Sequence, residues 1–361
     1  MSATTFVYTF PSVRGVQAGR AYFISQCPIR LLPKLFSFTD AELPPEMRSQ
    51  RSLNLKRVPE ISSYVVENRD SYVFSAITAS IDAEVQFEPN PAGQDRLGDL
   101  HVPMDARFII NDGQHRHAAL SHALEADPSL GDESIAVVFF IDLGLARSQQ
   151  MFADLNRHSV KPSPSIGVLY DHRDPLADMT RKVLEYLAPL AALVEREKTT
   201  LAPKSRKLFT LSAVHQAHKA LTAGLPDEER LDCAVAFWTA SFAGLSDWQS
   251  VAQGIQSAGE IRQEMIHSHG TLLHALGRAA NTIARQGSNA DWGHYTETLQ
   301  RIDWSRRPTS PWNGRVVIAG HVSKSNQSVA LASSYLKQQL GLEISPDEVR
   351  AEEALAAERT P

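Results

Sequence analysis

The chain has 361 residues, with 36 Lys or Arg against 41 Asp or Glu, so its formal net charge is −5. This balance excludes a protein that binds polyanions through its overall charge, although a local basic face can still bind them because binding responds to the field at the contact. The length favours about two domains, and no apolar run reaches the roughly 18 residues of a membrane-spanning helix. Cys27 and Cys233 form no C-x-x-C pair and the first ten residues lack the pattern of a secretory signal, which predicts a reduced, cytoplasmic protein with no membrane partner.

Strand and helix patterns are mixed in the first half of the chain. They predict strands at 6–10, 21–24, 72–81, 107–110 and 135–141, helices at 59–67, 114–125 and 147–155, and a loop or hairpin at 88–105. Thr39 to Glu42 has the spacing of a capping box. Proline breaks at Lys161 to Ser165 and at Asp174-Pro175 place the end of this part near residue 175. We therefore expect an α+β domain over residues 1–175.

Residues 176–361 carry apolar residues mainly at helical spacing. The pattern predicts helices at 176–196, 211–223, 229–243, 261–285, 290–301 and 325–340. Ser345 to Glu348 is another capping box, and residues 341–361 hold six acidic and two basic residues, which predicts a solvated terminal helix or a frayed end. The expected fold class is thus α+β, with a mixed N-terminal domain followed by a mainly α-helical domain over 176–361.

The sharpest motif is Asn111 to His117 (NDGQHRH), which follows a predicted strand and opens a predicted helix. Gly113 lets the backbone bend there, and the free amides of a helix start favour an anion. Arg116 offers a planar fork for phosphate oxygens, and His115 could transfer a proton near neutral pH. Asp112 could cap the helix, bind a metal or orient water. Asp-Gly is also an ordinary turn, so a purely structural role stays open.

The motif residues that we expect to face a nucleotide, a phosphate or DNA extend beyond this turn. They are Asp112, Gly113, Gln114, His115 and Arg116, together with Asn156, Arg157 and Arg51. Asn156 and Arg157 lie where a helix should end, so their charge could simply suit the helix dipole. Arg51 shares a helix-like face with Asn54 and Arg57, which alone is more typical of a solvated face.

The sequence contains no Walker phosphate loop, no G-x-G-x-x-G, no G-x-S-x-G and no H-E-x-x-H. A metal held by the later histidines stays open, although scattered core or surface histidines are the favoured interpretation and we predict no metal. Those histidines are His215, His218, His267, His269 and His274.

Three stretches together resemble one family. DGQHR (Asp112 to Arg116), FADLNRHSVKPS (Phe152 to Ser163) and YDHRDP (Tyr170 to Pro175) are similar to the DndB family, the regulatory member of bacterial DNA sulfur-modification (phosphorothioate) gene clusters. The order of these blocks is more specific than the DGQHR word alone. Further blocks extend the resemblance over nearly the whole chain: Gln50 to Arg57, Tyr72 to Asp82, Trp312 to Arg315 and Val322 to Ser325.

This resemblance implies a ParB and sulfiredoxin-like N-terminal domain, whose motif loop binds a nucleotide phosphate in some members. It implies a DNA-binding negative regulator of the modification operon rather than the sulfur-inserting enzyme. It also implies a bacterial, nucleoid-associated cytoplasmic protein that self-associates. No cofactor is certain, and a nucleotide with Mg²⁺ stays open.

Two basic segments are candidates for contact with double-stranded DNA. Residues 301–327 hold five basic residues and one acid, a local charge of +4, and residues 198–207 hold four basic residues and no acid. Phosphate contacts set the register of a protein on DNA. We expect them from Arg306, Arg307, Arg315 and Lys324, and from Lys204, Arg206 and Lys207. Ordinary exposed charge is the alternative.

The leading hypothesis is a repressor that binds the promoter of its own gene cluster. The rival is a nucleotide or phosphodiester hydrolase, in which Asp112 would orient water or Mg²⁺, His115 would handle a proton and Arg116 would stabilise phosphoryl charge. A third possibility combines the two, with a ligand at the motif altering the affinity for DNA.

Overall fold

The computed structural model describes residues 6–36, 57–91, 95–145, 147–157 and 162–359. The chain divides into two compact units, residues 1–160 and 161–361. This division falls ahead of the boundary expected near residue 175, because α6 (Pro164–Tyr170) packs against α7 and α9 of the second unit. The capping box expected at Thr39 to Glu42 lies outside the described residues.

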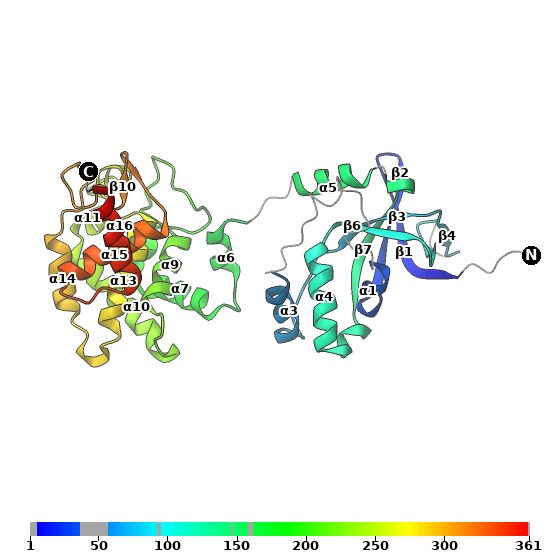
Figure 1. Ribbon diagram of the computed structural model, residues 1–361, viewed down its shortest axis with the longest axis horizontal. Helices are drawn as coiled ribbons and strands as arrows, with labels where there is room; N and C mark the ends of the chain where they lie inside the picture. The colour runs from blue at the N-terminus through cyan, green and yellow to red at the C-terminus, as the bar shows by residue number, and fades with distance from the viewer. Residues whose placement is uncertain (1–5, 37–56, 92–94, 146, 158–161, 360–361) are drawn as a thin grey trace, which may run out of the picture. The chain divides into compact units, whose positions relative to one another are not determined.

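The first unit is built on a seven-stranded sheet with the order β4-β5-β1-β2-β7-β3-β6 (Figure 1). Its strands are β1 (Val7–Gln17), β2 (Arg20–Pro28), β3 (Ile77–Asp82), β4 (Gln86–Pro89), β5 (Leu97–Pro103), β6 (Arg107–Asp112) and β7 (Ser134–Ile141). All neighbours are antiparallel except β3 and β7, which run parallel. The helices are α1 (Leu32–Leu35), α3 (Val58–Glu67), α4 (Gln114–Ala126) and α5 (Ser148–Arg157).

The sheet buries one face of its strands through their two-residue period. In β1, Phe10 and Ser12 are buried while Val7, Pro11 and Val13 are exposed. Phe10 packs against Phe139 of β7, with ring centroids 5.5 Å apart, and Phe139 packs against Phe108 of β6 at 5.8 Å. Residues from strands far apart in the chain therefore share one core.

The predicted strand at 72–81 begins only at Ile77. Between Val73 and Ala76, side chains replace the strand ladder as partners of three backbone groups. The Val73 amide donates to the Tyr64 hydroxyl (3.0 Å), and the Ser75 and Ala76 carbonyls accept from Arg116. The hairpin expected within 88–105 is confirmed as the antiparallel pair β4 and β5.

The second unit is mainly helical, with two short strand pairs, β8 (Val194–Glu195) with β9 (Phe209–Thr210) and β10 (Val317–Ile318) with β11 (His321–Val322). Its further helices are α7 (Pro175–Tyr186), α8 (Ala188–Leu193), α9 (Leu211–Leu221), α10 (Asp227–Gly244), α11 (Ser246–Ala252), α12 (Ala258–Glu264), α13 (Gly270–Ala284), α14 (Trp292–Arg301), α15 (Asn326–Gln339) and α16 (Pro346–Arg359). The central helix α13 packs against both α9 and α15. Its Gly277 is required at the contact with α9, because a Cβ there would overlap the Ala217 carbonyl oxygen.

Two helices predicted as continuous are divided. The prediction at 176–196 splits at Leu187 into α7 and α8, since Pro189 lacks an amide proton and disfavours helix before it. The prediction at 261–285 splits into α12 and α13, because the backbone between them pairs with another segment. Met265 forms a bridge with Ser305, and the Ile266 amide donates to the Trp304 carbonyl (2.9 Å).

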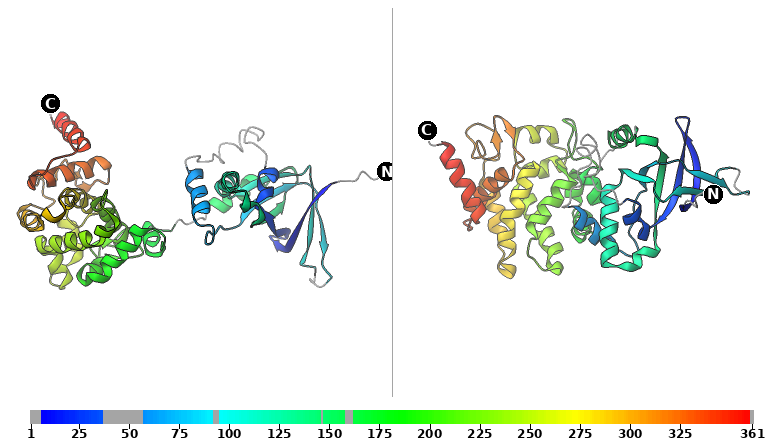
Figure 2. Two further views of the ribbon diagram at one scale, coloured as in Figure 1. Left: turned by 90° about the horizontal axis from the view of Figure 1, so that it is seen from below. Right: turned by 45° about the vertical axis from the view of Figure 1, so that its right-hand side comes forward.

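The terminal helix expected from the sequence is present as α16 and is exposed on one side, but its other side is docked on the unit and does not fray. Ala351 and Leu355 of α16 are buried against Ala330 and Leu331 of α15, and Figure 2 shows the two helices side by side. Glu348 is fully buried. Its carboxylate accepts hydrogen bonds from the Lys337 ammonium (2.9 Å), the Ser333 hydroxyl (2.6 Å) and the Ser345 amide (2.7 Å). These bonds complete one half of the predicted capping box and fasten the helix to the unit.

Candidate functional site

The DGQHR motif forms the turn from β6 into α4. Asp112 is the last residue of β6 and pairs with Thr78 of β3, and Gly113 is the N-cap of α4 with φ of +104°. Only glycine adopts this conformation at little cost. A Cβ at this position would also lie 3.1 Å from Ile77 and 3.3 Å from the Arg116 guanidinium. The glycine is therefore required by the turn and by the close approach of Arg116.

Arg116 directs its guanidinium into the unit. Its Nη1 atom donates to the carbonyls of Ser75 and Ala76, both at 2.7 Å, and contacts the Ser75 hydroxyl. Its Nη2 atom donates to the Asp112 carboxylate at 2.6 Å, and the Arg116 side chain is only 17% exposed. The expected phosphate fork and the expected acid or metal ligand thus bind each other. The arrangement clasps the segment before β3 to the start of α4.

Of the remaining motif side chains, Gln114 and His117 contact neighbouring main-chain carbonyls, whereas His115 favours its neutral form. The Gln114 amide donates to the Ile110 carbonyl (3.1 Å), and His117 Nε2 lies 3.2 Å from the Leu32 carbonyl oxygen. Desolvation, and then the nearby Arg57 charge, lower the pKa of His115. A neutral His115 lacks the charge that attracts phosphate.

Helices α3 and α4 start at the same end. His115, in the first turn of α4, feels the charge of Arg57 at the start of α3, and further along Ser62 Oγ lies 3.0 Å from His122 Nδ1. The two positive helix ends therefore lie together beside Arg57. This is the part of the motif region where an anion would find favourable charge.

Other residues grouped with the motif have different outcomes. Arg51 lies outside the described residues, and so do the side chains of Asn156 and Arg157 at the end of α5. Sequence reasoning missed a buried network behind the motif. Asn111 donates to the Ser80 hydroxyl and accepts from the Ser148 hydroxyl, both at 2.7 Å, and so joins α5 to β3 and β6. A polar residue at a core position of a strand was the available signal.

The later histidines are engaged in the helical core. His218 Nε2 accepts from the Trp238 indole (2.7 Å), and burial lowers the pKa of His218 to about 3. His267 Nδ1 accepts from the Trp248 indole (2.9 Å) and its Nε2 lies 2.8 Å from the Asp247 carboxylate. Within the described residues, no group of three or more His, Cys, Asp or Glu side chains is placed to hold a metal ion.

The basic segment at residues 198–207 forms a loop around an arginine of α12. The Arg262 guanidinium donates to the carbonyls of Ala202 (2.8 Å), Pro203 (3.0 Å) and Ser205 (3.1 Å), and also to that of Lys207. Lys204 and Arg206 are exposed, whereas the Lys207 ammonium donates to the Ala192 carbonyl (2.7 Å). The loop thus points carbonyls inward, while the side chains of Lys204 and Arg206 point outward.

The basic segment at residues 301–327 is attached to the C-terminal end of the same helix. The Arg306 amide donates to the Glu264 carbonyl (2.8 Å), and its guanidinium donates to the carbonyls of Gln263 (3.2 Å) and Gly320 (2.7 Å). Arg307 and Lys324 are exposed. Arg315 is instead paired with Glu352 of α16, with its guanidinium 5.8 Å from the centre of the Tyr335 ring.

The structure therefore brings the two basic segments together at α12, although about a hundred positions separate them in the sequence. We call Lys204, Arg206, Arg306, Arg307 and Lys324 the basic face. Figure 1 shows the loop that follows β8 and the loops around β10 at the same edge of the second unit. In the described part of the chain, no carboxylate forms an ion pair with any of these five side chains.

Comparison with protein families decides the family. The model of the DndB family, described as DNA-sulfur modification-associated, matches residues 10–343. The chain belongs to the DndB family. No curated protein and no solved structure matches the chain. The DndB match covers both units and contains the DGQHR clasp as well as the whole basic face, and it ends before α16 begins.

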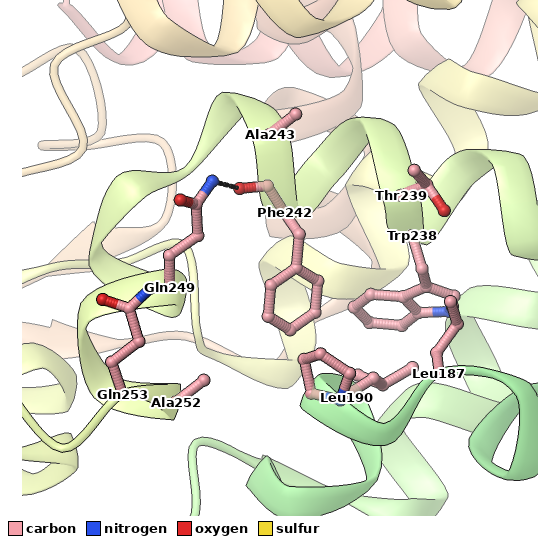
Figure 3. Close-up of a pocket in the computed structure, with 10 residues that line it drawn as sticks. Leu187, Leu190, Trp238, Thr239, Phe242, Ala243, Gln249, Ala252 and Gln253 are labelled. Carbon is pink, nitrogen blue, oxygen red and sulfur yellow. Dashed lines mark hydrogen bonds between the residues drawn. The ribbon is translucent and has the colours of Figure 1, made fainter.

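This DndB-family chain also has an apolar cavity of about 470 Å³ between α8, α10 and α11 of the second unit. Figure 3 shows the Trp238 and Phe242 rings lining it near Leu190, with the amides of Gln249 and Gln253 at one side. Its lining contains no titratable side chain, and its polar groups include the Thr239 hydroxyl and the two glutamine amides. Among the helices that the structure describes, none has both the length and the apolar character needed to cross a membrane.

Proposed function

We propose that this protein is a DNA-binding negative regulator of a DNA sulfur-modification gene cluster, and that the basic face contacts the phosphate backbone of its operator. The observation that carries the proposal is that α12 holds two basic segments, which contribute the five cationic side chains of the basic face, in a DndB-family chain whose net charge is −5. Such a face creates a local positive field that the overall charge does not predict.

The chemistry of the face suits a phosphate backbone. Arg307 and Lys324 are exposed, and Lys324 immediately precedes the N-cap of α15, Ser325. A helix start next to a lysine favours a phosphate oxygen. Asn326 and Gln327, exposed in the first turn of α15, add neutral donors. These contacts position the protein on duplex DNA, whereas base contacts would have to supply its sequence preference.

The test compares binding to the promoter of the protein's own gene cluster with binding to a scrambled duplex of equal length and composition. Fluorescence anisotropy should give tighter binding to the promoter, and a promoter-driven reporter should be repressed when the protein is expressed. Equal affinity for the two duplexes, together with an unrepressed reporter, would overturn the proposal.

The hydrolase alternative gains no support from the motif, because Arg116 and Asp112 bind each other and the backbone. The likeness of the first unit to the ParB and sulfiredoxin-like fold stays a prediction of the resemblance. So do a nucleotide with Mg²⁺, self-association and a bacterial nucleoid location. Calorimetric titration with ATP and CTP tests the nucleotide.

A further inference from the structure

Arg262 has an unusual set of partners for a surface helix. Four main-chain carbonyls from residues 202–207 converge on its guanidinium, whose planar fork offers five N–H donors. The bonded carbonyls belong to residues 202, 203, 205 and 207, while Lys204 and Arg206 are exposed. The clamp thus holds the backbone of the loop from inside and leaves the two cationic side chains outside.

A clamp of this kind matters because the loop is basic. Lys204, Arg206 and Lys207 repel one another, and a fourth cation at their centre adds to the repulsion unless carbonyl dipoles compensate it. The structure offsets that repulsion with hydrogen bonds from a charged donor, which are the stronger kind. These hydrogen bonds restrain the backbone of the loop at four carbonyls. Binding then loses less entropy when the loop meets a ligand.

The same helix fixes the second segment. The carbonyls of Gln263 and Glu264, directly after Arg262, accept hydrogen bonds from Arg306. Arg262 and Arg306 also both lie close enough to His269 to lower its pKa, although desolvation has the larger effect. The end of α12 is therefore a common base for the two segments, and their separation is set by adjacent residues of one helix.

We propose that Arg262 is a positioning residue for DNA binding: it presets Lys204 and Arg206 so that they and the Arg306 to Lys324 segment contact one stretch of duplex as a single face. Arg262 acts through the loop and does not itself touch the phosphates, because both of its terminal nitrogens donate to loop carbonyls. This inference rests on the proposed DNA-binding function and adds the partner surface and its internal support.

The main variant is Arg262→Met, with Arg230→Met as its matched control. Arg230 is also a partly exposed arginine that binds a carbonyl, that of Leu225, and it pairs with Asp227 outside the basic face. The readout is the slope of log affinity against log salt, measured by anisotropy on the promoter duplex. Each neutralised phosphate contributes about −0.9 to that slope. Arg262→Met should reduce the magnitude of the slope by the contribution of about two neutralised phosphates. Arg230→Met should leave the slope unchanged.

A double-mutant cycle separates positioning from general structural damage. If Arg262 acts only through the loop, then Arg262→Met should add no further loss to a Lys204→Ala, Arg206→Ala variant. Arg262→Lys keeps the charge with fewer and less directed donors, so it should restore part of the slope. The inference would be overturned if the losses of slope in the cycle were additive, or if Arg262→Met kept the wild-type slope.

Gly259→Ala tests the loop position if Arg262→Met fails to fold. A Cβ at Gly259 would lie 2.6 Å from the Pro203 carbonyl oxygen, so the loop must shift, while alanine favours the α12 helix itself. We expect the same loss of slope as in Arg262→Met, and an unchanged slope would contradict the inference. A wild-type protein that does not bind the promoter would instead sink the proposed function.

Discussion

Arginine side chains act as internal clamps in the described part of this chain, and three of them lie in or beside the candidate sites. Arg116 holds the segment before β3, Arg262 holds the loop before β9, and Arg306 ties the β10 and β11 region to α12. In each case the guanidinium donates to main-chain carbonyls. Sequence shows the charge of an arginine but not its acceptors, so the phosphate fork expected at Arg116 and the clamp found there have the same sequence pattern.

Replacing Arg116 with Met should lower the free energy of unfolding by about 2 kcal/mol, since charged hydrogen bonds are removed and Asp112 is left without its partner. Urea unfolding followed by circular dichroism measures the change. Arg57→Met, at an exposed arginine beside the same motif, is the control and should stay within about 0.5 kcal/mol of wild type. Unchanged stability in Arg116→Met, combined with loss of a measurable ATP affinity, would instead favour a nucleotide site.

At the scale of elements, glycine contacts report how closely the helices approach. Gly277→Ala should destabilise the protein by about 1–3 kcal/mol, because the new methyl overlaps the Ala217 carbonyl across the contact of α9 with α13. Gly167→Ala in α6 is the matched control. Its Cβ would meet no atom within 4 Å, so alanine should stabilise that helix by about 0.5–1 kcal/mol. Thermal unfolding should show a lower melting temperature for Gly277→Ala and a higher one for Gly167→Ala. Equal shifts of melting temperature in the two variants would refute the close packing.

The docking of α16 should depend on acid pH. The Ser345 hydroxyl, and then Arg278, hold the pKa of Asp347 at about 2, below its ordinary value of 3.8. A depressed folded pKa means that this contribution to stability is present above about pH 4 and is lost as the pH falls toward 2. Asp347→Asn should therefore show a smaller loss of urea midpoint between those pH values than wild type. Glu353→Gln, on an exposed face of α16, serves as control, and an identical acid response in Asp347→Asn would contradict the account.

Sequence patterns predicted most elements but not their interruptions. The alternation in β1, the apolar run of β7 and the helix after Gly113 follow from local periodicity and turn chemistry. The break between α12 and α13 depends on pairing with Ser305 some forty residues later, which no local pattern reveals. Likewise, the acidic composition of α16 predicted solvation, whereas the basic partners that bury Glu348 come from other helices.

At the scale of the whole molecule, the net charge of −5 is an average over regions of opposite sign. Sequence predicted the two basic segments but could not join them, because their connection runs through hydrogen bonds of α12. It also could not separate Arg315, which is neutralised by Glu352, from Arg307 and Lys324, which are exposed. The basic face therefore contains fewer cationic side chains than the sequence predicted for DNA contact.

The most direct test of DNA binding by this face is the salt dependence of promoter affinity in a Lys204→Ala, Arg206→Ala, Arg307→Ala, Lys324→Ala variant. Anisotropy titrations across salt concentrations should show a slope smaller in magnitude than wild type by about 0.9 for each phosphate that the variant no longer neutralises. The control variant, Lys182→Ala with Arg230→Ala, removes two cations paired with Asp178 and Asp227 and should keep the wild-type slope. A wild-type slope in the quadruple variant would contradict the account.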